Sequence, residues 1–395
     1  DFTKAIELDA WYAKAYNGRG LAKSNLKDFS NAIADFTKAI ELDPENAEGF
    51  TNRGCAKYHL KDYTGAMTDI NKAINIYPTH FAYYVRGRTR TFLDNPYGAI
   101  EDFTKALDLN PEYSEAYHSR GIEKFFIEDD SAAIADFTKA IELDPENAKA
   151  FENRGLAKNH LEDYSGAIPD FTKALEIDSL NTEAYTSRGL AKYFLDNDSG
   201  AVEDYNKSIE LDPEFALAYY NRGLAEYFLN NDSGAIVDFT KAIELDSEYS
   251  SAYYWRGLAK HLLDDNTDAI IDFTKAIELD PHYALTYYNR GNAKKALEDY
   301  SDAVTDYTKA IELDSVNALA YFYRGHSYHY LDSYSLAIVD YNKAIELDTE
   351  DALVYHNRGL AKESLGFINE ACYDWWKAAE LGDVDAGKLV TENCK

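Results

Sequence analysis

Hydrophobic and polar positions repeat along this chain with an almost constant period. The clearest marker is an Arg-Gly pair that occurs eleven times. Its arginines are Arg19, Arg53, Arg86, Arg120, Arg154, Arg188, Arg222, Arg256, Arg290, Arg324 and Arg358. The step is 34 residues, except for 33 residues between Arg53 and Arg86. A period of this size indicates one structural unit copied along the chain, which is the pattern of a solenoid.

Each unit predicts two helices. When positions are counted from seven residues before each Gly, an aromatic residue stands at position 4, Gly at 8, Ala at 20 and an aromatic residue or Ile at 24. Positions 20, 24, 27 and 28 share one face of a helix, and positions 4, 8, 11 and 14 mark one side of an earlier helix. Gly and Ala lack bulk, so two antiparallel helices can approach closely beside the large residue at position 24. Asp at position 31, followed by Pro or Ser in several units, ends the second helix.

Opposite charges also recur together. Position 23 is Asp in every unit, as at Asp35 and Asp238, and position 7 is always the Arg of the marker. We predict an ion pair between the first and second helix of each unit, because Arg makes directed bidentate contacts with carboxylates. The alternative is that both charges are solvated separately.

The pattern resembles the tetratricopeptide repeat family, whose signature is W-x2-L-G-x2-Y…A-x3-F…P. The resemblance covers nearly the whole chain, with Arg for the usual Leu at position 7, mostly Lys at 11 and rarely Gly at 15. It implies an all-α, right-handed superhelical solenoid of antiparallel helix pairs. We expect the second helix of a truncated repeat at 1–10, eleven tandem repeats at 11–382 and a C-terminal capping helix at 383–395, with further sequence upstream. The Arg-Gly pair and the ending at Cys372 are similar to bacterial arrays of this family.

The resemblance implies a concave groove, lined by the first helices, that holds a peptide or a partner protein. Positions 2, 5, 9, 12 and 13 would face it, with 5 and 9 the strongest candidates, and part of the aromatic stripe would be core. The candidate groove residues are Tyr84, Arg88, Tyr193, Tyr220, Tyr227, Tyr254, His261, Tyr288, Lys295, Phe322, His326 and His329. Tyrosine offers a large contact area and a hydroxyl at low entropic cost. Position 5 is never Lys, and position 9 is Asn only at Asn292, so a groove that clamps heat-shock chaperones is not expected.

Charge and motifs narrow the function further. The net charge of −30 favours solubility and argues against nucleic acid as a partner. No apolar run has transmembrane length, and no nucleotide-binding, catalytic or zinc motif occurs, so we expect no enzyme activity, cofactor or metal. His326, His329, His356 and Glu363 are the best candidates for a metal site, although ordinary polar roles are favoured. Three nearby basic residues, Arg86, Arg88 and Arg90, fit either a local site for an acidic peptide or, as we favour, a solvated helix face.

Several residues suggest modification. Cys372 and Cys394 flank Gly382 and form a candidate disulfide, which would imply an oxidising compartment; two reduced cysteines are the equal alternative. Localisation stays open, with a lean towards a secreted, periplasmic or cell-surface protein. Asn197 and Asn231 stand in N-glycosylation sequons. Ser131, Ser179 and Ser315 follow Asp in a three-residue motif that resembles an O-glycosylation motif of secreted bacterial proteins.

The leading functional hypothesis is a non-enzymatic protein-protein interaction scaffold that binds an extended peptide or partner protein in its concave groove. The alternative is a structural subunit of a self-assembling extracellular filament or surface assembly. Near-identical units favour this alternative, and the C-terminal cap opposes it. A third interpretation is an accessory array attached to an upstream enzyme or sensor domain.

Overall fold

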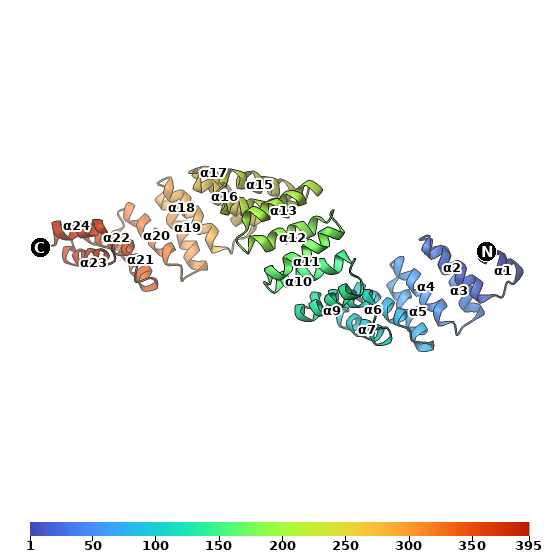
Figure 1. Ribbon diagram of the computed structural model, residues 1–395. Helices are drawn as coiled ribbons and strands as arrows, with labels where there is room; N and C mark the ends of the chain where they lie inside the picture. The colour runs from blue at the N-terminus through green and yellow to red at the C-terminus, as the bar shows by residue number, and fades with distance from the viewer. Residues whose placement is uncertain (395) are drawn as a thin grey trace. The chain divides into compact units, whose positions relative to one another are not determined.

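The computed structural model describes residues 1–394, and within them it contains 24 helices and no strand. The all-α fold predicted from the sequence is therefore confirmed. The chain forms two compact units, Asp1–Asn197 and Asp198–Lys395. In each unit, every helix packs against the next helix along the chain, and the first helices of neighbouring repeats also touch (Figure 1).

The N-terminal unit contains α1, five helix pairs and one further first helix. Their bounds are α1 (Phe2–Leu8), α2 (Ala13–Asn25), α3 (Phe29–Leu42), α4 (Ala47–His59), α5 (Tyr63–Ile76), α6 (His80–Phe92), α7 (Pro96–Leu109), α8 (Ser114–Phe126), α9 (Asp130–Leu143), α10 (Ala148–His160), α11 (Tyr164–Ile177) and α12 (Thr182–Tyr193). Even numbers are the first helices of repeats, and odd numbers from α3 onward are second helices.

The C-terminal unit contains one second helix, five helix pairs and a last short helix. Their bounds are α13 (Asp198–Leu211), α14 (Ala216–Phe228), α15 (Asp232–Leu245), α16 (Ser250–Leu262), α17 (Asn266–Leu279), α18 (Ala284–Ala296), α19 (Tyr300–Leu313), α20 (Ala318–Tyr330), α21 (Tyr334–Leu347), α22 (Ala352–Ser364), α23 (Ile368–Glu380) and α24 (Val384–Asn393).

Polar caps and one unusual backbone position shape the turn inside each repeat. The Asp163 side chain accepts a hydrogen bond of 2.9 Å from the Gly166 amide and so begins α11. Position 15, just before this cap, has a φ of 54 to 63° in ten repeats, although it holds Lys, Asp, Glu or Asn there. Only Gly366 places a glycine at this left-handed position. In ten repeats a residue other than glycine therefore adopts the left-handed conformation at this turn, which costs conformational energy.

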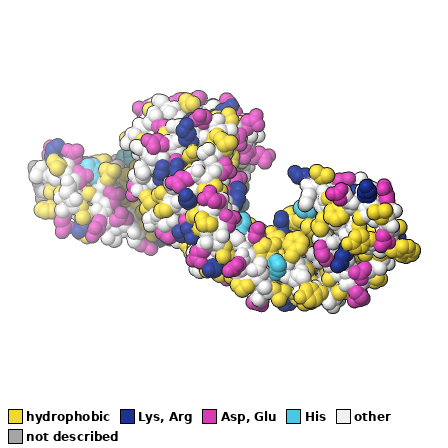
Figure 2. Space-filling view, turned by 45° about the vertical axis from the view of Figure 1, so that its right-hand side comes forward, with side chains coloured by type: hydrophobic (Ala, Val, Ile, Leu, Met, Phe, Trp, Pro, Cys, Tyr) yellow, Lys and Arg dark blue, Asp and Glu magenta, His cyan; other side chains and the backbone are white. Residues whose placement is uncertain are grey.

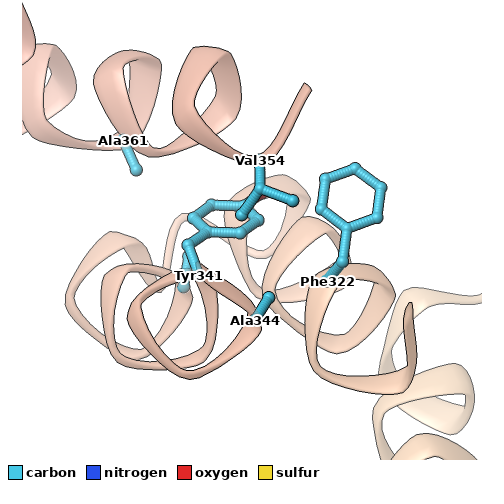
Figure 3. Packing of buried hydrophobic residues seen from close by; sticks show 6 residues of the cluster. Phe322, Tyr341, Ala344, Val354 and Ala361 are labelled. Atoms are coloured by element: carbon cyan, nitrogen blue, oxygen red, sulfur yellow. The ribbon is translucent and has the colours of Figure 1, made fainter. Parts of the chain in front are cut away.

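The close crossing of paired helices depends on the glycine at position 8. A Cβ atom added at Gly223 would lie 2.8 Å from the Phe239 ring, closer than side chains normally pack. The residue at position 24 is therefore seated directly on the glycine, as the sequence predicted. Figure 3 shows such a ring, that of Tyr341, covered from the next repeat by Val354 and Ala361. Each ring thus belongs to the core between two repeats.

The predicted Arg–Asp ion pair is confirmed in ten repeats. Arg Nη2 donates to the Asp at distances of 2.5 to 2.7 Å, and Arg Nε donates to its other oxygen at 2.8 to 3.0 Å. The eleventh Arg and Asp, Arg188 and Asp204, belong to different units. The alternative of separately solvated charges is therefore wrong for these ten repeats.

Two further contacts enlarge this pair into what we call the Arg–Asp frame. In eight repeats the cation at position 11, such as Lys57, reaches the same Asp within 2.7 to 2.9 Å. Arg Nη1 also donates to a Thr or Asn on the second helix of the preceding repeat, as from Arg53 to Thr37 at 3.1 Å. The frame therefore joins helices within a repeat and links adjacent repeats.

The C-terminal helix α24 is attached covalently. Cys372 on α23 and Cys394 form a disulfide with a Cα–Cα distance of 5.6 Å. Leu389 and Val390 pack against the cluster that contains Trp375, whereas Trp376 is 63% exposed. The cap therefore covers Trp375 but not Trp376, because the next residue along α23 points to a different face of the helix.

Candidate functional site

The inner surface of the first helices differs from the sequence expectation at position 5. Tyr254 is 7% exposed and Phe322 is 3% exposed, so neither can present a face to a partner. Tyr254 Oη accepts a hydrogen bond of 3.0 Å from Asn289 of the next repeat, and Phe322 is directed toward Val354 of the next first helix (Figure 3). In these two repeats position 5 therefore lies in the seam between repeats, and its assignment as a leading groove position is wrong for Tyr254 and Phe322.

The other aromatic candidates keep part of their surface accessible. Tyr84, Tyr220 and Tyr288, also at position 5, are half-buried, as are the four candidates at position 12, which are Tyr193, Tyr227, His261 and His329. Burial raises the pKa of Tyr220, Tyr227 and Tyr288. Their phenols therefore stay neutral at physiological pH and remain able to donate hydrogen bonds.

Position 13, the last of the five positions expected to face the groove, contributes a further aromatic surface. Phe92, Phe126, Phe194, Phe228 and Tyr330 stand there with exposed fractions of 49 to 70%. Three of these rings stack on an aromatic residue of the preceding repeat, with centroid distances of 4.7 to 5.1 Å, and we call the five residues the aromatic rim. Their recurrence at one repeat position is visible in the sequence.

Arg88 lines a hollow of about 320 Å³ in the N-terminal unit. Its guanidinium lies 5.2 Å from the Tyr58 ring and 6.0 Å from the Tyr84 ring. Arg86 and Arg90 instead pair with Asp102 in the Arg–Asp frame. The sequence cluster thus separates into two structural residues and one exposed cation that faces the hollow. Figure 2 shows hydrophobic side chains gathered over part of this unit among scattered charges.

A second hollow, of about 300 Å³, lies in the C-terminal unit between α16, α18 and α20. His261, Asn292, Lys295, Tyr323 and His326 line it, together with Ala296 and Tyr300. Lys295 Nζ stands 4.2 Å from the centroid of the Tyr323 ring. The structure thus brings three of the predicted groove residues, His261, Lys295 and His326, to one place. His329, one turn further along α20, forms an edge contact with Tyr334.

His356 has a role within the fold. His356 Nδ1 is 2.8 Å from Asp383 Oδ2, so this imidazole holds the start of α24 rather than joining His326 and His329. Residues 1–394 contain no group of three or more His, Cys, Asp or Glu side chains placed to hold a metal ion. Over the same residues, no helix is both long enough and apolar enough to cross a bilayer.

The candidate modification sites are all on the surface. Ser131, Ser179 and Ser315 are exposed, as are Asn197 and Asn231. The Asn231 side chain already has two contacts, because its amide nitrogen donates to Glu226 at 2.7 Å and its oxygen accepts from the Gly234 amide at 3.2 Å. Glycosylation of Asn231 would have to replace the first of these contacts.

A further hollow, of about 540 Å³, lies elsewhere. Its lining residues, which include Tyr373 and Trp376, all come from the second helix α23. It is therefore not part of the surface formed by the first helices. We assign the candidate groove to positions 9, 12 and 13 of the first helices, because several neighbouring repeats contribute to it.

Models of the tetratricopeptide repeat match nine segments of the chain. The matched residues are 13–46, 47–80, 82–113, 128–182, 197–230, 216–249, 250–283, 284–316 and 325–366. Together these segments cover most of both units. A search of curated proteins found no match.

Solved structures with similar folds include three repeat proteins. The crystal structure of MamA is 28% identical, over 44% of this chain and 95% of MamA, with a TM-score of 0.41. A tetratricopeptide repeat protein from Parabacteroides merdae is 18% identical, over 62% of this chain and 98% of its own, with a TM-score of 0.45. YrrB, described as having an unusual peptide-binding site, is 23% identical, over 55% and 95%, with a TM-score of 0.35.

Proposed function

This chain belongs to the tetratricopeptide repeat family, and we propose that it is a non-enzymatic scaffold that binds an extended segment of a partner protein along its first helices. Membership in this family supports a role in protein-protein interaction. The finer assignment, to the groove at positions 9, 12 and 13, is carried by the aromatic rim.

Exposure of the aromatic rim to water is energetically unfavourable. Five aromatic side chains at the same repeat position keep about half or more of their surface accessible. Exposed aromatic side chains that recur at one repeat position are typical of interaction surfaces, where they become binding hot spots. The hollows beside Arg88 and Lys295 adjoin the same helices and would receive side chains of the bound segment.

Peptide display on the full chain tests this proposal. Random peptides are selected against the protein, and the affinities of the enriched sequences are measured by calorimetry. The double variant Phe228→Ser, Tyr330→Ser should weaken peptides that bind the C-terminal unit by about tenfold or more, because each truncated hot spot costs roughly 1 to 2 kcal/mol. The matched control is Val237→Ser, Val339→Ser, which removes two exposed apolar side chains from second helices of the same unit. Failure to enrich any peptide, or equal losses in both variants, would contradict the proposal.

The second candidate is the self-assembling filament or surface assembly. It is favoured by an apolar stripe at position 22 of the second helices in the C-terminal unit. Val237, Ile271, Val339 and Tyr373 stand there with exposed fractions of 62 to 68%. Light scattering over a concentration series separates the two candidates. A monomer at every concentration excludes assembly, whereas an oligomer that Val237→Lys, Ile271→Lys dissolves would favour it.

A further inference from the structure

Lys295 differs from the half-buried basic residues that form ion pairs. In those ion pairs a carboxylate lies within 4.0 Å of the cation, as Asp306 lies 2.9 Å from Lys294. Lys295 is also half-buried, yet no carboxylate lies within that distance among residues 1–394. Its ammonium group instead lies over one face of the Tyr323 ring. A cation–π contact of this kind contributes about 0.5 to 2 kcal/mol, which offsets only part of the cost of removing an ammonium group from water.

The imidazoles beside Lys295 add unsatisfied polar atoms. Among residues 1–394, His326 Nδ1 is buried and has no hydrogen-bond partner, and the same is true of His329 Nδ1, which lies one turn further along α20 and outside the lining of the hollow. His261 Nδ1, on the opposite side of the hollow, is 2.5 Å from Asn266 Oδ1. Buried polar atoms are normally hydrogen-bonded, so an orphan beside a hollow points to a missing ligand. Burial, with repulsion from Lys295 and His329, lowers the pKa of His326 to about 4, so this ring is neutral at physiological pH.

No acidic side chain lines this hollow, in a protein with 70 acidic and 40 basic residues. The lining therefore consists of one ammonium group, two imidazoles, an amide and aromatic rings. One carboxylate would match the single positive charge and accept the hydrogen bonds that these groups can donate. A phosphate dianion would leave negative charge uncompensated, because no arginine lines the hollow.

We propose that the hollow between α16, α18 and α20 binds a carboxylate group of the partner segment, with Lys295 as its counter-ion and His326 as a hydrogen-bond partner. This inference rests on the proposed peptide-binding function and specifies its chemistry. The carboxylate comes either from an Asp or Glu side chain or from the C-terminus of the partner. In both cases the carboxylate forms an ion pair with Lys295.

The test uses peptides selected by display on the full chain. Each is synthesised with Glu or Asp replaced by the corresponding amide, and separately with an amidated C-terminus, so that the two sources of carboxylate are distinguished. Lys295→Met should weaken the acidic peptide by tenfold or more and leave its neutral version nearly unchanged. Lys309→Met is the control, because it removes the same charge from the exposed surface of α19, where Lys309 pairs with Glu312. Lys295→Arg should retain most of the affinity.

The outcomes separate this inference from the proposed function. If peptides bind at the aromatic rim but Lys295→Met weakens acidic and neutral versions equally, the carboxylate site is overturned while the scaffold survives. Displacement by inorganic phosphate but not by acetate would also overturn it. Thermal melting checks the fold: because Met removes an unpaired, half-buried charge, Lys295→Met should melt at the same or a higher temperature than the parent chain. A lower melting temperature would contradict the unpaired state of Lys295.

Discussion

The repeat α14–α15 and the repeat α18–α19 share a frame but differ at two adjacent positions. Both place an arginine against a buried aspartate and seat an aromatic ring on a glycine. At position 11 the first has Glu226 and the second has Lys294. At position 12 the first has Tyr227 and the second has Lys295. One substitution changes the interior of the helix pair, and the next changes the surface available to a partner.

The difference shows that neighbouring positions of one helix carry separate tasks. Lys294 points toward α19 and completes the frame at Asp306, whereas Lys295, about 100° further around α18, faces the hollow. In α14, Glu226 cannot neutralise Asp238, and the pKa of Asp238 is raised by burial and by Glu226 despite the bond from Arg222. The frame tolerates this loss, so position 11 tunes stability, and under the proposed function position 12 sets what the groove can bind.

The largest expected effect comes from removing the aspartate of each frame. Asp306→Asn leaves Arg290 and Lys294 without their carboxylate and should cost about 3 kcal/mol. Asp238→Asn removes one partner of Arg222 but also relieves the repulsion from Glu226, so it should cost about half as much. Hydrogen exchange resolved to individual helices measures each local opening, because repeats of a solenoid unfold semi-independently. Equal losses would show that position 11 has no influence on the frame.

A methyl group at position 8 should affect both repeats alike. Added Cβ atoms at Gly223 and Gly291 would each lie 2.8 Å from the facing ring of Phe239 or Tyr307. Overpacking costs about 1 to 3 kcal/mol, and the better helix propensity of Ala returns up to about 1 kcal/mol. We expect a net loss of about 1 to 2 kcal/mol for Gly223→Ala and for Gly291→Ala, measured by the same exchange experiment. Phe239→Leu should rescue Gly223→Ala; if it does not, the ring contact is not the cause.

How far the sequence could predict these features depends on the range of the contact. The Arg–Asp pair and the glycine crossing lie within one repeat and recur eleven times, so their register was readable. The lysine at position 11 recurs almost as often, but it was noted only as a departure from the family pattern. Tyr254 and Phe322 were misplaced because their burial depends on the angle at which the next repeat packs. The local period does not specify that angle. The register between α23 and α24 was likewise undetermined, so the disulfide stayed one of two alternatives.

Glu226→Lys should give the repeat α14–α15 the same residue at position 11 as the repeat α18–α19. A lysine there can reach Asp238 as Lys260 reaches Asp272 at 2.8 Å, and we expect a gain of about 1 kcal/mol at pH 7, despite the lost contact to Asn231. Glu226→Gln should give about half, since it removes repulsion without adding a partner.

The pH dependence of this gain follows from the direction of the shift. Because the pKa of Asp238 is raised in the folded protein, its ionisation opposes folding above the ordinary carboxyl pKa, and this penalty fades as the pH falls. In the lysine variant, Asp238 should instead resemble Asp35, whose pKa is lowered overall. Burial raises the pKa of Asp35, but the hydrogen bonds and charges of Arg19 and Lys23 outweigh this effect. A carboxylate with a lowered pKa stabilises the folded protein while it is ionised, and this stabilisation is lost as the pH falls. The advantage of Glu226→Lys should therefore shrink below a pH of about 4, as denaturant titrations at several pH values would show. A constant advantage would mean that the gain is not electrostatic.

The smallest effect concerns the turn after each first helix. Position 15 is Asn230 in one repeat, with a φ of 60°, and Glu298 in the other, with a φ of 62°. Asn enters this left-handed region more readily than Glu, whose Cβ and longer side chain make it costly. Glu298→Gly should therefore stabilise its repeat by about 0.5 to 1 kcal/mol, and Asn230→Gly by only a few tenths, in denaturant unfolding monitored by local exchange. Since neither side chain lies in the frame or the groove, both variants should keep the peptide affinity of the parent. A gain that was equal in the two repeats would show that the strain belongs to the backbone position and not to the residue that occupies it.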